Sequence, residues 1–416
     1  MTKDLKIDLE NKKRIDTPLE QRQSVSILLG AGFSVPQGYP TGKIVNESMQ
    51  KFDNFPVDFA PSGELATSTN GEKPHFQVYG MNLYQKRFTF CKRLINEYAK
   101  VKGEFDYEAF YDFIKSQEIY QPQYQKICDD FVDEYNDYHS FATGIEPIYN
   151  QMVAYLIKDK NGRCWYDGEP HHVGYIESYD GFLNILSLWS NDHLINVHTL
   201  NHDMIFESFK KTDYLIGKIS DGFDEFGSPY YGILEKQNVH YHVRLERYKG
   251  RYNTSVRLYK LHGSLDYVLY YRTKDSVILI PDKYVKIQYG IGPGYLIKSR
   301  KSKVGYETFP FAVHSDFLTG TTTKIFRYRE SLLYRKLFKK FRKNLEQAEI
   351  LLIAGYGFKD TKINEIIIDK FNFQLKPIII IDPFPSCETK EFALRTKAKI
   401  LEKSITDITT TDIPKI

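Results

Sequence analysis

The chain has 416 residues, of which 42% are hydrophobic and 26% are charged, and its formal net charge is +4 at pH 7. This length exceeds one ordinary domain, so it indicates either two domains or one core that carries large insertions. No apolar stretch approaches the roughly 18 residues that cross a membrane, and Met1 to Gln23 contain no apolar signal core. We therefore expect a soluble, cytoplasmic protein that has no membrane partner.

The basic residues and the cysteines give little sign of nucleic acid, disulfides or metal. The densest basic clusters, Lys298 to Lys303 and Arg335 to Lys343, are expected to be solvated faces, with a nucleic-acid footprint as the alternative. The cysteines stand singly in the sequence, at Cys91, Cys128, Cys164 and Cys387. Scattered cysteines of this kind predict reduced thiols rather than a disulfide or a metal site.

The first predicted strand leads into a glycine turn. Residues 1–19 are expected to be an N-terminal extension, and residues 20–44 the first piece of the core. The apolar run from Val25 to Leu29 is typical of a buried parallel strand, and Gly30-Ala31-Gly32-Phe33-Ser34 follows it directly. Such a glycine turn lets backbone N–H groups approach a pyrophosphate, although taken alone it is also compatible with a simple tight turn.

Residues 45–189 are predicted to be a mostly helical insertion. Apolar residues recur at three- and four-residue spacing, first at Phe110, Phe113 and Ile114, and again at Ile127, Phe131, Tyr135 and Tyr138. The chain contains 32 Tyr and 28 Phe, which indicates either ordinary packing or a protein–protein surface.

The next core piece, residues 190–211, contains the strand Leu194 to Val197 and then Thr199-Leu200-Asn201-His202-Asp203. Asn201 and Asp203 alternate with Thr199, so their side chains can point into one cleft. An asparagine suits a ribose hydroxyl or an attacking water, and an aspartate can accept from a carboxamide. The alternative is that one of them caps a helix that begins near Met204.

A third strand-like run, in residues 255–270, ends in Leu261-His262-Gly263-Ser264. A neutral imidazole at His262 can take a proton from a hydroxyl or a water, although an isolated histidine can equally be a buried hydrogen-bonding residue. The flanking residues 212–254 and 271–320 contain glycines and alternating patterns, which indicate insertions of short strands and loops.

The last part of the chain predicts a helix and then a strand–turn–helix–strand unit. Residues 321–344 read as an amphipathic basic helix, and residues 345–390 as the final core piece. In that piece the strand Ile350 to Ala354 precedes the turn Gly355-Tyr356-Gly357-Phe358, and Asp382 follows the strand Ile378 to Ile381. Residues 391–416 are expected to be a C-terminal tail. Continuous apolar strands separated by a helix indicate a parallel sheet, which binds ligands past its carboxyl ends.

These motifs, in this order and context, resemble those of the sirtuin family. The resemblance implies an α/β fold with a Rossmann-like parallel sheet and an NAD site. It implies that Asn201, His262 and Asp203 are catalytic. The residues that the resemblance assigns to NAD binding are Gly30, Ala31, Gly32, Phe33, Ser34, Thr199, Gly355, Tyr356, Gly357 and Asp382.

Two departures from the family's deacylases bear on activity. Gly38-Tyr39-Pro40 is followed by Thr41-Gly42-Lys43 rather than the aromatic and arginine of those enzymes, and four scattered cysteines cannot supply their zinc ribbon. The chain therefore looks more like the sirtuin-like NAD hydrolases of bacterial anti-phage systems, with NAD as substrate and no metal. An NAD-dependent protein deacylase and a non-catalytic NAD or ADP-ribose sensing module remain the alternatives.

An NAD hydrolase would deplete its own cell, so the resemblance also implies control by assembly. We expect a homo-oligomer, a sensor partner such as an ATPase or a nucleotide-processing subunit, or both, with nucleic acid involved at most indirectly. The helical insertion is the expected docking element, through exposed aromatic residues in Tyr107 to Tyr138.

Overall fold

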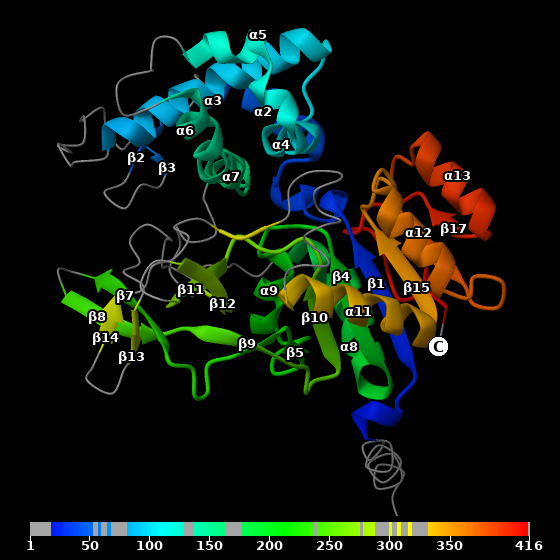
Figure 1. Ribbon diagram of the computed structural model, residues 1–416. Coiled ribbons are helices and arrows are strands. Elements are labelled where there is room, and N and C mark those ends of the chain that lie inside the picture. Colours follow the sequence, from blue (N-terminus) through cyan, green and yellow to red (C-terminus); the bar gives the residue numbers. More distant parts are fainter. Residues whose placement is uncertain are drawn as a thin grey trace, which may run out of the picture.

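The described part of the molecule consists of a helical lobe and an α/β body (Figure 1). The computed structural model describes residues 18–52, 57–59, 65–67, 81–128, 137–162, 177–236, 239–274, 278–287, 299–301, 306–308, 315–317 and 332–414. Of the residues that the sequence singled out, Phe131, Tyr135 and Cys164 lie outside these ranges, as do half of the cluster Lys298 to Lys303 and the first part of the expected basic helix 321–344.

The body is built on a seven-stranded sheet in which all neighbouring strands are parallel. This confirms the predicted α/β class with a parallel sheet. The strand order is β17-β16-β15-β1-β4-β10-β5. The bounds are β1 Ser24–Leu29, β4 Leu194–Thr199, β5 Ile219–Ser220, β10 Val256–Lys260, β15 Ala348–Ala354, β16 Ile378–Ile381 and β17 Lys399–Leu401.

Helices cover both faces of this sheet, which explains why its central strands are continuous apolar runs. In β1, Leu28 packs on one side while Ile27 and Leu29 pack on the other, because successive side chains of a strand alternate. The first side, here the α11 face, is covered by α11 (Leu332–Gln347), α12 (Thr361–Lys370) and α13 (Cys387–Thr396). The second, the α8 face, is covered by α8 (Asp180–Asp192) and α9 (Ile205–Ser208).

The sheet reverses its winding between β1 and β15. From β1 the chain continues toward β4 through α8 on one face, and from β15 it continues toward β16 through α12 on the other face. The carboxyl ends of two such strands diverge into helices on opposite faces and leave a crevice, where open α/β sheets bind ligands. The fold therefore predicts a ligand site at the carboxyl ends of β1 and β15.

The helical lobe lies above the sheet in the view of Figure 1. Its elements are α2 Gly42–Gln50, α3 Met81–Lys102, α4 Tyr107–Lys115, α5 Pro122–Gln125, α6 Tyr138–Thr143 and α7 Ile145–Leu156, with the hairpin β2 Val57–Phe59 and β3 Leu65–Thr67. The ring of Phe110 lies 5.1 Å from those of both Tyr98 and Tyr149, centroid to centroid. Tyr111, Phe113 and Tyr124 are buried as well. Four of the described aromatic residues of Tyr107 to Tyr138 are thus in the core of the lobe and are not available for docking, whereas Tyr107, Tyr120 and Tyr138 are half-buried.

A strand-rich region flanks the other end of the body. One antiparallel sheet contains β11 Tyr267–Lys274, β12 Ile278–Lys286, β9 Glu246–Arg251 and β6 Gly222–Asp224. Another contains β14 Tyr306–Thr308, β13 Ser299–Lys301, β7 Tyr230–Lys236 and β8 Val239–Arg244. Short strands were the expectation for residues 212–254 and 271–320. β11 begins at Tyr267, inside the segment expected to belong to the core.

The segment expected as a C-terminal tail is part of the α/β body. The second half of α13 and the edge strand β17 lie within it, and Ile405, Ile408 and Ile413 pack against the α8 face. Likewise, α8 lies in the segment expected as a helical insertion but covers the sheet. Its burial of Phe182 and Leu186 among strand residues shows why that helix belongs to the body.

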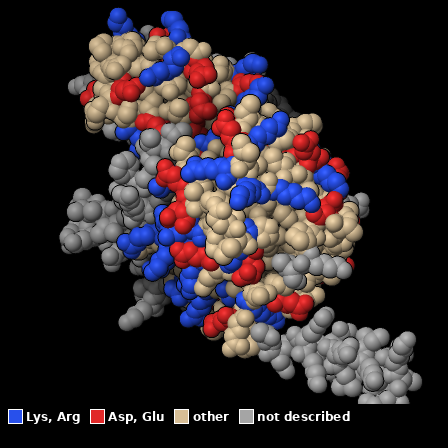
Figure 2. Space-filling view, turned by 90° about the vertical axis from the view of Figure 1, so that its right-hand side faces the viewer, with Lys and Arg blue, Asp and Glu red and all other residues tan. Residues whose placement is uncertain are grey.

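Charges on the face over α12 and α13 are mixed. Figure 2 shows Lys and Arg interspersed with Asp and Glu on this side. Ion pairs join Lys362 to Glu365 at 2.8 Å and Lys370 to Glu346 at 3.2 Å. No helix among the described residues is both long and apolar enough to cross a membrane.

Candidate functional site

The glycine turns that follow β1 and β15 pack directly against each other. We call Gly30–Ser34 the first glycine turn and Gly355–Phe358 the second. Gly30 N donates to Ala354 O at 3.0 Å, and Gly32 N donates to Gly355 O at 2.8 Å. Gly355 has φ +63°, and a Cβ built there would lie 2.1 Å from the backbone N of Phe33. Only glycine fits at this position, because a side chain would meet the facing backbone as well as adopt an unfavourable conformation.

This close packing changes which backbone groups can bind an anion. The N–H groups of Phe33 and Ser34 are also engaged, since they donate to Gly30 O and Ala31 O at 3.0 Å each. Within the described residues, the N–H groups of Ala31, Tyr356 and Gly357 are left without a protein acceptor. Ala31 and Gly357 are exposed at the same edge. Of the residues that the sequence assigned to NAD binding in these two turns, Ala31, Tyr356 and Gly357 keep a backbone N–H group that can meet an anion, whereas the N–H groups of Gly30 and Gly32 are used to join the turns.

A buried hydrogen-bond chain connects the end of β4 to the first glycine turn. Asn201 Nδ2 donates to Gly30 O and to Ser34 Oγ, each at 2.9 Å. Ser34 Oγ in turn donates to Asp203 Oδ2 at 2.6 Å. All three side chains are buried, with Asn201 9% exposed. The structure thus brings together three residues that the sequence placed in one site from two separate motifs.

Asp203 also caps the helix that follows it. Its Oδ1 accepts from the backbone N of Ile205 at 3.0 Å, at the start of α9. The helix-cap alternative therefore holds for this residue, and its role in a binding site stays a prediction. Burial raises the pKa of Asp203, while the Lys260 ammonium and the hydrogen bonds from Ser34 and Ile205 act in the opposite direction.

His262 lies in the turn after β10, next to the turn after β4. Leu261 N donates to Thr199 O at 2.9 Å, and Leu265 N donates to His202 O at 3.0 Å, so the two turns are held together by backbone hydrogen bonds. The His262 side chain is 6% exposed, and its Nε2 lies 3.6 Å from Asp360 Oδ2. That contact becomes an ion pair when the imidazole is protonated. The geometry gives a base whose protonated form has a carboxylate beside it.

Asp360 lies beside His262 and was not among the residues predicted from the sequence. Its Oδ1 accepts from Lys362 N at 3.0 Å and Ile363 N at 3.1 Å and so caps α12, while its Oδ2 faces His262. An aspartate before the helix Thr361 to Phe371 is a visible N-cap signal. The sequence offered no sign that the second oxygen meets a histidine from a distant strand.

Four predicted cofactor residues use their side chains for structure. Phe33 is buried on the α8 face, 5.2 Å from Tyr179 between ring centroids, so its ring anchors the turn and does not face a ligand. Thr199 Oγ1 accepts from Asn201 N at 3.0 Å. The Tyr356 hydroxyl donates to Asn364 Oδ1 at 2.9 Å. Asp382 Oδ1 accepts from Phe384 N at 2.9 Å and shapes the turn that leads to α13.

The described cysteines form no metal site. Cys91 is fully buried, and burial raises the pKa of its thiol, whereas Cys387 is exposed on α13. No group of three candidate ligands gathers within the described ranges.

Comparisons with known proteins point to one family. Residues 199–403, slightly less than half of the chain, match the family model of the SIR2-like domain. This segment contains Asn201, His262 and the second glycine turn, and the first glycine turn lies outside it. No curated protein matches the chain.

Solved structures similar to this chain include several sirtuins. A Sir2 homologue in complex with NAD is 12% identical with a TM-score of 0.37, covering 95% of this chain and 90% of that chain. A mutant Sir2 homologue in complex with ADP-ribose is 11% identical with a TM-score of 0.35, covering 98% and 93% of the two chains. A structure described under the mechanism and regulation of Sir2 enzymes is 9% identical with a TM-score of 0.34, covering 98% and 94%. Similarity of this degree carries no conclusion about chemistry.

Proposed function

We propose that this chain is an NAD⁺ hydrolase, which cleaves the nicotinamide–ribose bond to give nicotinamide and ADP-ribose. The observation that carries the proposal is the buried chain Asn201–Ser34–Asp203 at the crevice of a parallel sheet, beside His262. The match to the SIR2-like domain supports NAD as the substrate, because it includes Asn201, Asp203 and His262 together with the second glycine turn.

The residues at the crevice fit a dinucleotide. The N–H groups of Ala31, Tyr356 and Gly357 suit a pyrophosphate, and Gly357 leaves open space around its Cα. Asp203 uses each carboxylate oxygen once, so it retains lone pairs that can accept from the carboxamide of nicotinamide. Asp382 follows the end of β16, where it would bind the adenosine ribose.

In the reaction we propose, water attacks the anomeric carbon of the nicotinamide ribose. The carbon–nitrogen bond breaks, its electron pair leaves with neutral nicotinamide, and the proton of the water passes to His262. Asn201 Oδ1 accepts from the attacking water or from a ribose hydroxyl. Because the transition state is oxocarbenium-like, positioning and electrostatic stabilisation supply most of the acceleration, and no metal takes part.

Product analysis tests this proposal. Purified protein is incubated with NAD⁺, with and without an acylated peptide, and the products are separated. Nicotinamide and ADP-ribose without peptide support the hydrolase. O-acyl-ADP-ribose formed only with peptide, or bound zinc and loss of activity on chelation, would show a deacylase. Intact NAD⁺ recovered from the protein under activating conditions would show a sensing module.

The cellular setting follows from the same activity. We propose that the enzyme acts in the cytoplasm as an NAD-depleting effector of anti-phage defence, held inactive until it self-associates or meets a sensor protein. Sedimentation with NAD⁺ turnover tests control by assembly. Full turnover by a monomer without partner or ligand would contradict it.

A further inference from the structure

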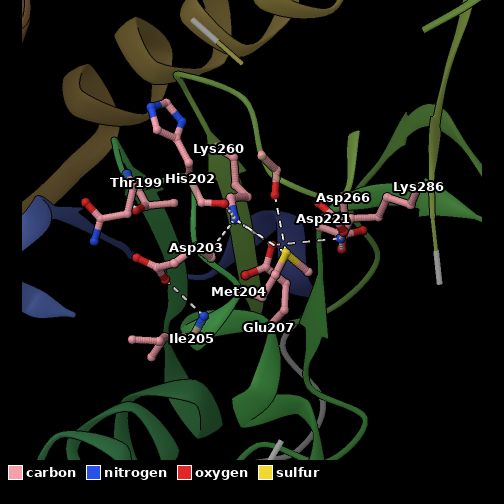
Figure 3. A network of polar contacts seen from close by, with 12 residues as sticks. Thr199, His202, Asp203, Met204, Ile205, Glu207, Asp221, Lys260, Asp266 and Lys286 are labelled. Carbon is pink, nitrogen blue, oxygen red and sulfur yellow. Dashed lines mark hydrogen bonds and ion pairs between the residues drawn. The ribbon is translucent and has the colours of Figure 1, made fainter. Parts of the chain in front are cut away.

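A cluster of buried charges lies directly beneath the turn that carries Asn201 and Asp203. Figure 3 shows it running from Asp203 through Lys260 and Glu207 to Lys286. We call this the charge cluster; its members are Lys210, Lys260, Lys286, Glu207, Asp221 and Asp266. Apart from Lys210, each side chain is at most 8% exposed. The proposed reaction uses none of these groups.

Lys260 is the member that touches the site. Its Nζ donates to Asp203 O and, at 3.4 Å, to His202 O, and it lies 3.2 Å from Glu207 Oε1. Its side chain is fully buried. Two consecutive carbonyls that point at one ammonium fix the two peptide planes of the turn. The orientation of the Asp203 side chain, and through Ser34 that of Asn201, depends on those planes.

The rest of the cluster balances the charge of the Lys260 ammonium. Glu207 also lies 3.9 Å from Lys286, which pairs with Asp221 at 2.6 Å and Asp266 at 3.4 Å. Burial alone would lower the pKa of Lys286, but these three carboxylates raise it well above its ordinary value. Buried ion pairs are weak devices for stability, because desolvation offsets most of their attraction. The cluster contacts the turn that carries Asn201 and Asp203 through Lys260, so its charges can act on the geometry of that turn.

We propose that Lys260 is a positioning residue: it holds the 202–204 backbone so that Asn201 and Asp203 keep their reactive orientation. The inference deepens the proposed NAD hydrolysis and rests on it for the kinetic consequence. The positioning itself is independent of any substrate.

The test compares three variants with the wild type. The variant Lys260→Met/Glu207→Gln removes the ammonium together with the charge that would otherwise be left buried. Glu207→Gln alone keeps Lys260 and its carbonyl contacts. Lys210→Met is the matched control, since it removes a 2.9 Å ion pair with Asp221 in the same cluster and leaves Lys260 and Glu207 unchanged.

The rate of amide hydrogen exchange measures how firmly the backbone of residues 202–204 is held, and it needs no substrate. The amides of Ile205 and Leu265 bond to Asp203 Oδ1 and His202 O, so they report on the turn. We expect exchange at both to be at least about tenfold faster in the double variant at an unchanged melting temperature, and unchanged in the other two. In NAD cleavage the double variant should lose about a hundredfold in kcat with little change in KM.

The outcomes separate the two hypotheses. If the wild-type protein cleaves no NAD⁺, the proposed function is wrong. The amide exchange rates would still decide whether Lys260 positions the turn. A double variant with wild-type exchange and wild-type kcat would overturn the inference, as would slowed cleavage with unchanged exchange. If the double variant does not fold, the wild type still tests the inference: Ile205 and Leu265 should exchange only by global unfolding, and exchange by local opening would contradict it.

Discussion

The carbonyl of Gly30 decides which way the amide of Asn201 faces. A carbonyl oxygen can only accept, so the Asn201 nitrogen must point toward Gly30 O and Ser34 Oγ, both 2.9 Å away. Its Oδ1 is thereby turned away from the turn, and no described residue donates to it. The protein thus uses both donors of this amide for structure and leaves its acceptor for a water or a ligand.

From this geometry we predict that Asn201→Ala and His262→Ala each lower kcat for NAD cleavage by about a hundredfold or more, because they remove a water-positioning group and a general base. His139→Ala, in the helical lobe, is the matched control and should cleave at the wild-type rate. Initial rates of ADP-ribose formation provide the measurement. Full activity in either site variant would refute the site assignment.

His198 shows how a histidine in the same sheet can be purely structural. It is fully buried on the α11 face, with its ring 4.9 Å from that of Tyr259 and its Nε2 3.4 Å from Asn344 Nδ2. Burial lowers the pKa of His198 from 6.5 to about 3. The native imidazole therefore stays neutral over a pH range in which the unfolded chain binds a proton.

This shift predicts the sign of a pH effect on stability. The contribution of His198 is fully present above pH 6.5 and is lost as the pH falls toward about 3, since only the unfolded state is protonated in that window. The loss should amount to about 2 kcal/mol between pH 6.5 and about pH 5. Urea unfolding of the wild type and of His198→Phe at both pH values measures it. Equal pH dependence of the two proteins would contradict the prediction.

At the scale of elements, α13 contributes more to the body than its sequence indicated. Phe392 is 6% exposed, and its ring lies 4.5 Å from that of Phe358 on the α11 face, whereas Leu394 on the same helix is 85% exposed. We predict that Phe392→Ala lowers the free energy of unfolding by about 3 kcal/mol, through lost burial and the cavity left behind. Leu394→Ala should stay within about 0.5 kcal/mol of the wild type. Chemical denaturation measures both, and similar losses would show that α13 is not docked as described.

The central strands were predictable because they follow a simple physical rule. A strand buried on both faces is apolar at most positions, and Ile350 to Ala354 and Ile378 to Ile381 stand out for that reason. The edge elements carry weaker signals. α13 has only two apolar residues on its buried side, Phe392 and Ala393, and β17 is three residues long, so together they read as a tail.

The strand-end residues of the candidate site could be predicted from the sequence. The residues that contact them could not. Asn201, Asp203 and His262 follow strands, so their type and position indicated a cleft. The pairing of Asp360 with His262, and of Lys260 with Asp203 O, depends on which loops the fold brings together. Neither contact leaves a pattern in the linear sequence. For the same reason the sequence could not show that the N–H groups of Gly30 and Gly32 would be taken by the second turn.

At the scale of the whole molecule, the contact between the two glycine turns joins parts from opposite ends of the chain. Gly355 has φ +63° and no room for a Cβ, while a Cβ at Gly357 would meet nothing within 4 Å. We predict that Gly355→Ala lowers the free energy of unfolding by about 3 kcal/mol, through backbone strain and overlap with Phe33 N. Gly357→Ala should unfold within about 0.5 kcal/mol of the wild type. Thermal or urea unfolding of the pair measures this, and equal stabilities would contradict the packing of the turns.

The same contact determines when during synthesis the crevice can form. β1 leaves the ribosome long before its neighbour β15 and the Gly355 turn are translated, because Ser26 of β1 bonds to Asn344, 318 residues further on. Until then β1 can pair only with β4, and one wall of the crevice does not exist. A nascent chain, or one truncated before β15, therefore lacks the second glycine turn. For the NAD hydrolase proposed above, a site that needs both glycine turns keeps partly synthesised copies inactive.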